Sequence, residues 1–192
     1  MRFQVFRNGK VVERFQVCGA YMFGTDGTSM RKAQITFSDG YIECQKPSHE
    51  TGGLALLWPI EGFGRILLPT TCLPERDRPY CLNVEIARAR LMQIVNCRED
   101  WSLFEGAIEL EDISNQARKL FIQSVQNIHR QDAAAKLADN SLRKAMIFSE
   151  KLATTHADIM FKARKSTRGF GPACLPAAVW RAGLGSHRRN CP

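Results

Sequence analysis

The sequence of 192 residues has no acidic residue after Asp158, although seven lysines and arginines follow Phe161. It also has no Cys-x2-Cys pair, the spacing typical of zinc and redox sites. No apolar run approaches the roughly 20 residues of a membrane span, and the first stretch reads as a strand rather than a signal peptide. These absences predict a cytoplasmic protein with no membrane partner, no cofactor, no metal and free, reduced cysteines.

The sequence also lacks the motifs that predict catalysis. It contains no Walker-type loop, no G-x-S-x-G and no H-E-x-x-H. The glycines of "GFGRIL" precede a strand-like run, whereas a phosphate cradle needs a helix after the turn. The histidines are scattered, and His156 and Asp158 would not face each other on a helix. We therefore expect no enzymatic activity and no catalytic residue in this chain alone.

The net charge of +8 is concentrated near the end of the sequence. Residues 1–161 hold all 19 acidic residues and 20 of the 27 lysines and arginines, so this part carries a net charge of only +1. A nearly neutral body gives no electrostatic reason to bind phosphates. Nucleic acid is therefore expected only as a non-specific partner of the basic last stretch.

The first 80 residues predict β structure. Asn8-Gly9 and Asp39-Gly40 are two-residue turns that tolerate positive φ, and each joins two strand-like runs. The apolar runs "GLALLWPI" and "FGRILLP" flank Gly62. The continuous apolar letters "LALLW" indicate a strand that is buried on both faces.

After Pro79 the apolar spacing becomes helical. We expect Asn83, Ser114 and Asp132 to cap three successive helices, the last a long one through Ala163. One side of this last helix is lined by small and apolar residues, namely Ala138, Ser141, Ala145, Phe148, Leu152 and Thr155. The fold class is α+β: an antiparallel β sheet or sandwich over about residues 1–80, three helices over about 83–165, and then a disordered tail.

Aromatic and charged side chains near the sheet are the candidates for contact with a ligand or another domain. A pyranose ring is recognised by flat aromatics beside charged groups, although "LALLWPI" equally suits a core or an interface. The segment 73–90 is either a rigid connection locked by ion pairs or a docking surface. The candidate glycan- or domain-contact residues are Trp58, Phe63, Arg76, Asp77, Arg78 and Tyr80.

Four stretches carry a resemblance to a known family: "MRFQVFRNGK", residues 53–101 ("GLALLWPIEGFGRILLPTTCLPERDRPYCLNVEIARARLMQIVNCREDW"), "ARKLFIQSVQ" and "KLATTHADIMFKARK". From Met1 to about Gly171 the chain resembles the amino-terminal, non-catalytic region of large family-10 glycoside hydrolase (endo-1,4-β-xylanase-like) proteins of planctomycete-type bacteria. In that family such a region precedes a (β/α)8 barrel that hydrolyses xylan. The resemblance implies that residues 1–165 are an accessory domain, with the absent barrel and xylan-type glycan as partners.

The resemblance carries no catalytic residue onto this chain. A (β/α)8 barrel takes about 250 residues, and retaining glycosidases need two carboxylates about 5–5.5 Å apart. In the resembled family both glutamates lie in the barrel, and no position of this sequence matches either motif. The chain is therefore interpreted as a protein that is truncated before its catalytic domain.

Residues 166–192 fit this interpretation as a tail. A natural disordered basic tail would explain the missing acids, but not Trp180, Leu175 and two cysteines. Glycine, alanine, proline, arginine and cysteine together are what a GC-rich gene yields when it is read in the wrong frame. We interpret residues 166–192 as a disordered, out-of-frame tail that follows a frameshift near Gly171.

Two other functions stay open at this point. The basic tail could make the chain a nucleic-acid binder, and residues 112–163 could form a helical protein-interaction module. The truncated accessory domain carries a further expectation, since faces meant for a barrel would remain exposed as an apolar patch.

Overall fold

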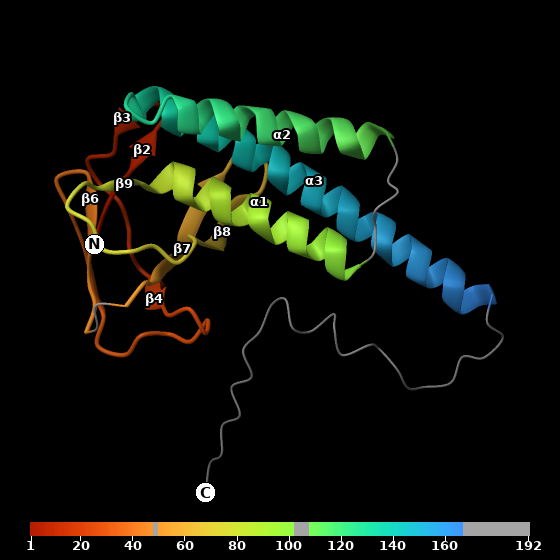
Figure 1. Cartoon of the computed structure of the whole chain (residues 1–192), viewed down its shortest axis with the longest axis horizontal. Helices are drawn as coiled ribbons and strands as arrows, with labels where there is room; N and C mark the ends of the chain where they lie inside the picture. Colours follow the sequence, from red (N-terminus) through yellow and green to blue (C-terminus); the bar gives the residue numbers. More distant parts are fainter. Residues whose placement is uncertain (48–49, 102–107, 167–192) are drawn as a thin grey trace, which may run out of the picture. The chain divides into compact units, whose positions relative to one another are not determined.

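The computed structural model describes residues 1–47, 50–101 and 108–166 (Figure 1). In this part, nine short strands come first and three helices follow, which confirms the predicted α+β class. The predicted tail beyond residue 166 lies outside the described residues, as do His49, His187, Cys174 and Cys191. The chain divides into two units at His156. The second unit begins at Ala157, so its described part is the end of the last helix.

Two strand pairs are hairpins at the predicted turns. The strands are β2 (Phe6–Arg7) and β3 (Lys10–Val11), and β5 (Gln34–Ser38) and β6 (Tyr41–Gln45). Both residues of each turn have positive φ: 53° and 74° at Asn8 and Gly9, and 50° and 83° at Asp39 and Gly40. Such turns match the twist of the flanking strands, which confirms both hairpins.

The β5–β6 hairpin belongs to a four-stranded sheet with the order β5-β6-β1-β9. Its other strands are β1 (Arg2–Gln4) and β9 (Tyr80–Cys81). β1 and β9 pair in parallel, with Phe3 opposite Tyr80, so the prediction of an antiparallel sheet is wrong for this pair. β9 ends at Cys81 and the first helix begins at Leu82, so the chain passes from this parallel strand into the helix without a loop.

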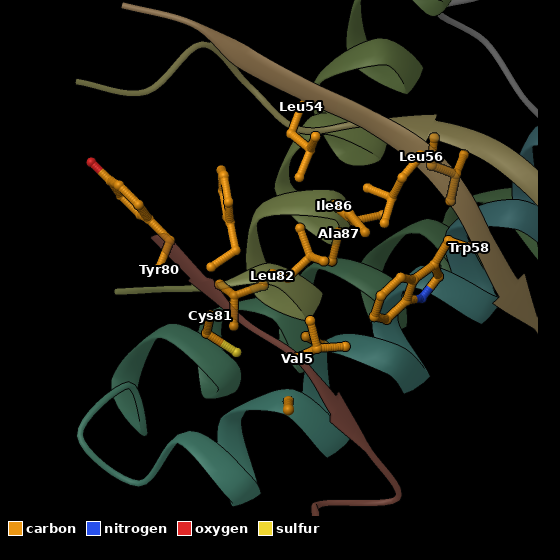
Figure 2. Close-up of a cluster of buried hydrophobic side chains, with 14 of the residues drawn as sticks. Val5, Leu54, Leu56, Trp58, Tyr80, Cys81, Leu82, Ile86 and Ala87 are labelled. Carbon is orange, nitrogen blue, oxygen red and sulfur yellow. The ribbon is translucent and has the colours of Figure 1, made fainter. Parts of the chain in front are cut away.

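A third sheet, β4-β7-β8, contains the strand that was predicted to be buried on both faces. Its strands are β4 (Tyr21–Phe23), β7 (Gly53–Ile60) and β8 (Gly64–Pro69). The central strand, β7, is buried along most of its length, which confirms the prediction. Figure 2 shows Leu54, Leu56 and Trp58 of β7 facing the beginning of the first helix, where Leu82 and Ile86 are fully buried.

The helices are α1 (Leu82–Asp100), α2 (Ile108–Gln126) and α3 (Gln131–Ser166). All three exist as predicted, but the predicted caps are wrong. Asn83 and Ser114 lie inside their helices with buried side chains, and Asp132 lies in the first turn of α3. α2 begins earlier than predicted because Leu110 and Ile113 extend its apolar stripe onto a second hydrophobic cluster. No helix among the described residues has the length and apolar character that crossing a membrane requires.

Small residues on α3 allow close helix packing, as predicted. The hydroxyl of Ser141 donates a hydrogen bond of 2.8 Å to the carbonyl of Ala117 on α2. Ala138, Ala145, Phe148 and Leu152 are buried on the same side of α3, while Thr155 is half-buried. The second cluster lies among the three helices, and the main cluster joins α1 and α3 to the sheets.

Asn83 links the strands to the helices through one buried amide. Its oxygen accepts a hydrogen bond from the backbone N–H of Phe6 at 3.2 Å, and its nitrogen donates to the carbonyl of Phe6 at 3.0 Å. The same nitrogen donates to the Asp139 carboxyl at 2.8 Å. A side-chain amide has one acceptor and two donor hydrogens, so it can satisfy both backbone groups of Phe6 and still reach α3. Capping would use only one of these groups, which explains why Asn83 lies inside the helix.

Replacing Asn83 tests the energetic weight of this amide. Asn83→Ala leaves the buried backbone groups of Phe6 without partners, so we expect the free energy of unfolding to fall by about 3–5 kcal/mol. Asn96→Ala is the control, since Asn96 is exposed on the same helix. It should change the stability by less than about 0.5 kcal/mol. Urea unfolding followed by circular dichroism measures both variants, and equal effects would contradict the assigned role.

Candidate functional site

A cavity of about 450 Å³ lies where two hairpins meet the first half of α3. Its wall comes from the β2–β3 hairpin, the β7–β8 hairpin and residues 139–143 of α3. These segments are far apart in the sequence but belong to the same compact unit. A concave site built from several elements is the usual form of a small-ligand pocket, and its volume falls within the common range of about 300–1,000 Å³. We call it the hairpin pocket.

Two local features hold the hairpin pocket together. The Asn83 amide connects Phe6 of β2 with Asp139 of α3, and both residues line the pocket. At the tip of the β2–β3 turn, Gly9 has no side chain, and the Lys136 side chain of α3 occupies the space that a Cβ would need. The turn therefore favours glycine for its positive φ, and a larger residue there would displace the flexible end of the Lys136 side chain.

The apolar wall of the hairpin pocket is aromatic on one side. The rings of Phe15 and Trp58 lie 5.8 Å apart with a tilt of 38°, and both residues line the pocket. Trp58 is only 4% exposed, so most of its ring belongs to the main hydrophobic cluster. Phe15 is half-buried and also contacts Phe37 at 6.1 Å. These contacts fix the aromatic wall in place.

The polar rim of the hairpin pocket carries three arginines and two carboxyl groups. Arg143 forms an ion pair with Glu61 at 3.3 Å, and both side chains are well exposed. Arg65 donates to the amide oxygen of Gln16 at 3.1 Å. Arg7 is exposed and forms no hydrogen bond or ion pair within the described residues. Asn8 and Asn140 add neutral polar groups to the same rim.

Asp139 is the chemically distinctive group of the hairpin pocket. Burial raises the pKa of its carboxyl to about 6, against the opposing effects of the Asn83 hydrogen bond and the Arg7 charge. A carboxyl with such a pKa changes its charge within the physiological range. The hairpin pocket can therefore present either a proton donor or a negative charge to a ligand.

The predicted contact residues do not come together in one site. Trp58 lines the hairpin pocket, whereas Phe63 is half-buried against the main cluster beyond the end of β7. Figure 2 places Trp58 and Tyr80 at opposite sides of the cluster of buried side chains. Arg76 and Asp77 line a different hollow, of about 300 Å³, beside Met1 and Arg2. The loop that leads into β9 is thus separate from the hairpin pocket.

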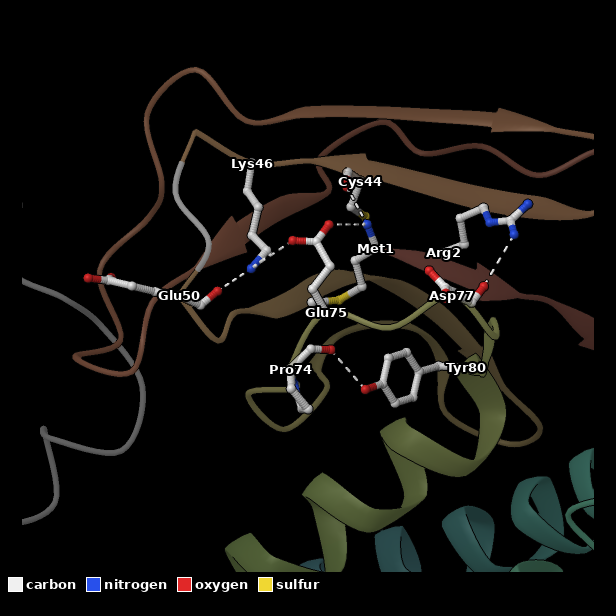
Figure 3. Close-up of polar contacts among 9 residues, drawn as sticks. All are labelled: Met1, Arg2, Cys44, Lys46, Glu50, Pro74, Glu75, Asp77 and Tyr80. Carbon is white, nitrogen blue, oxygen red and sulfur yellow. Dashed lines mark hydrogen bonds and ion pairs between the residues drawn. The ribbon is translucent and has the colours of Figure 1, made fainter.

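This loop is held by contacts within the chain (Figure 3). The hydroxyl of Tyr80 donates to the carbonyl of Pro74 at 2.8 Å, and the Arg76 guanidinium lies 3.4 Å from the centre of the Tyr80 ring. Arg76 also donates to the carbonyls of Arg78 and Pro79. Arg2 donates to the carbonyl of Asp77 at 3.3 Å. Of the two interpretations of this segment, the contacts favour a rigid connection into α1.

The sequence interpretation missed Arg7, Glu61, Asp139, Asn140 and Arg143 as residues of one site. The sequence could have indicated Asp139, because it lies four residues after Ala135 and three before Leu142, which are both buried on α3. An acid at this spacing falls on the apolar face of a helix, where a carboxyl needs a partner. The other residues left no signal, because their proximity depends on how the hairpins meet α3.

The described cysteines offer no nucleophile to this site. Cys18, Cys44, Cys72, Cys81 and Cys97 are free, as predicted. Burial raises the pKa of the Cys44 and Cys81 thiols to about 12. Because the thiolate is the reactive form, these two groups are inert at neutral pH.

The raised pKa of Asp139 predicts a pH dependence of stability. The pKa of the Asp139 carboxyl rises from 3.8 to about 6 on folding. As the pH increases, this carboxyl therefore ionises at a lower pH in the unfolded chain than in the folded chain. The free energy of unfolding should therefore fall as the pH rises from about 4 to about 6, by on the order of 2–3 kcal/mol. Asp139→Asn keeps an acceptor for Asn83 and cannot ionise, so it should be more stable than the native chain at pH 7.5 and similar at pH 4.

Urea unfolding of both proteins between pH 4 and 8 measures this difference. Comparing the variant with the native chain isolates Asp139 from Glu85, another carboxyl whose pKa is raised by burial. A stability difference that does not change across this range would show that Asp139 does not titrate as described.

Comparison with known proteins finds no match: no family model, no curated protein and no solved structure is significantly similar to this chain. The assignment of the hairpin pocket accordingly depends on its own geometry, namely the aromatic wall, the arginine-rich rim and the buried carboxyl of Asp139.

Proposed function

We propose that the folded part of this chain is a non-catalytic binding module whose hairpin pocket takes a saccharide. The single observation that carries the proposal is the pocket itself, which combines the half-buried Phe15 ring, packed on the buried Trp58, with polar side chains from three elements. A sugar ring presents apolar C–H faces and a rim of hydroxyl groups, and such a pocket offers a partner to each.

The polar rim suits hydroxyl groups in both directions. Asn140 has donor and acceptor atoms in one exposed amide, and Arg143 and Glu61 add donors and acceptors beside it. Because Arg143 and Glu61 already pair with each other, they are held in place before a ligand arrives. Preformed polar groups cut the ordering cost of binding.

The non-catalytic part of the proposal is supported by how the pocket carboxyls are used. Glu61 is paired with Arg143, and Asp139 accepts a hydrogen bond from Asn83. A retaining glycosidase uses two carboxyl groups about 5–5.5 Å apart, one as nucleophile and one as acid/base. We propose that catalysis belongs to a family-10 barrel outside this chain, as the family resemblance implies, and that xylan-type glycan is the ligand class to test first.

Calorimetric titration of the full chain with xylo- and cello-oligosaccharides tests the proposal. We expect saturable binding that Asn140→Ala weakens by about 2- to 10-fold, since one hydrogen bond contributes roughly 0.5–1.5 kcal/mol. Asn96→Ala, an exposed asparagine replaced outside the hairpin pocket, should leave the affinity unchanged. Absence of saturable binding to every saccharide would refute the saccharide proposal. Release of reducing sugar from xylan by the purified chain would refute its non-catalytic part.

A second candidate function is docking to the barrel through the helices. Large apolar side chains are exposed on the two shorter helices: Met92 and Val95 on α1, and Ile122 and Val125 on α2. Exposed apolar groups of this size mark interaction surfaces when they are contiguous. If a lost barrel covered them, the full chain should self-associate at high concentration. Dynamic light scattering measures this, and a clean, stable monomer would count against a large uncovered interface.

A further inference from the structure

In the part of the chain that the structure describes, the three arginines of the hairpin pocket do not all have a hydrogen-bond or ion-pair partner. Three arginines line it, and the contacts of Arg65 and Arg143 are with Gln16 and Glu61. Arg7 has no such contact within the described residues and lies at the end of β2, where the strand enters its turn. A guanidinium beside an apolar wall is a strong donor for an oxyanion, because its N–H groups form a fork that matches a carboxylate.

The Asp139 side chain repels an anionic ligand only when its carboxyl group is ionised. The charged groups that line the pocket with it are Arg7 on β2, Glu61 and Arg65 on the β7–β8 hairpin, and Arg143 on α3. The Cys81 thiol interacts electrostatically with Asp139 but stays neutral, because burial raises the pKa of this thiol to about 12. Burial likewise favours the neutral form of the Asp139 carboxyl, with a pKa of about 6. Below this pH the Asp139 carboxyl can donate a proton to a ligand oxygen, and above it the carboxylate repels an anion.

We propose that the hairpin pocket prefers a sugar acid, whose carboxylate pairs with the Arg7 guanidinium, and that protonation of Asp139 strengthens this binding. This inference rests on the proposed function, because it names the class of saccharide for the same pocket. Once Asp139 is protonated, the Arg7 guanidinium no longer faces the negative charge of that carboxyl and can pair with a ligand carboxylate. The planar fork of a guanidinium matches a planar carboxylate, which favours a sugar acid over a neutral sugar.

The pH dependence follows from the titration of Asp139. A sugar carboxylate is ionised throughout the range from pH 5 to pH 8, so its own charge does not change. Ionisation of Asp139 adds a negative charge to the hairpin pocket beside the ligand carboxylate, and the affinity should fall as the pH rises through about 6. Asp139→Asn remains neutral at every pH, so its affinity for the sugar acid should be independent of pH.

Calorimetric titration of the full chain with glucuronate and with glucose compares an acid and a neutral sugar of the same shape. At pH 5.5 we expect glucuronate to bind about tenfold more tightly, the usual gain from one charge-assisted contact. Arg7→Gln should remove this preference, whereas Lys10→Gln should keep it. Lys10 is the matched control because it lies opposite Arg7 in the same hairpin, is exposed, and does not line the pocket.

Repeating the titration at pH 8 tests the role of Asp139. The native chain should lose several-fold in affinity for glucuronate, and Asp139→Asn should lose none. Thermal unfolding of each variant checks that it is folded, which is expected for Arg7→Gln because Arg7 is exposed.

Each outcome discriminates between the two proposals. Equal binding of glucuronate and glucose would overturn the sugar-acid inference but leave the proposed function standing. Tighter binding of glucose 6-phosphate than of glucuronate would overturn the assignment of a carboxylate. A preference for glucuronate that survives in Arg7→Gln, or that does not change with pH, would overturn the roles of Arg7 and Asp139. No binding of any sugar would overturn both proposals.

Discussion

The buried amide of Asn83 is the interaction on which the rest of this structure depends. β2 pairs with β3 on one side only, so the backbone groups of Phe6 on its other side need partners inside the protein. Unpaired polar groups in such a position cost about as much as a large fraction of a domain's stability. One asparagine satisfies them and also reaches α3, which fixes the distance between the first hairpin and the last helix.

The hairpin pocket is a consequence of that fixed distance. Asn83 and Asp139 form a hydrogen-bonded pair that connects the hairpin with α3. The space that remains is bounded by Trp58 and Phe15 on the apolar side and by arginines on the rim. The group that holds the fold together therefore also positions the carboxyl that faces the hairpin pocket, and it lowers the pKa of this carboxyl against the larger effect of burial.

Local chemistry explains which parts of the fold could be predicted. The two hairpins follow from Asn-Gly and Asp-Gly turns, which need no distant partner, and β7 follows from its apolar run. Asn83 was misassigned as a cap because its true partner is 77 residues away in the sequence. Arg7 and Asp139 come from opposite ends of the described chain, so no spacing in the sequence indicated that they share a pocket. Trp58 was placed in the candidate site for its aromatic ring, but nearly all of that ring is core.

The parallel pairing of β1 with β9 affects how this chain can fold during synthesis. During synthesis β1 leaves the ribosome about 77 residues ahead of its parallel neighbour β9 and of Asn83. Asp139 follows later still. Contacts between residues so far apart in sequence form slowly. The strand edges of the early hairpins therefore remain unpaired until the helices have been made, unless a chaperone covers them. Nascent chains are most prone to aggregate during that interval.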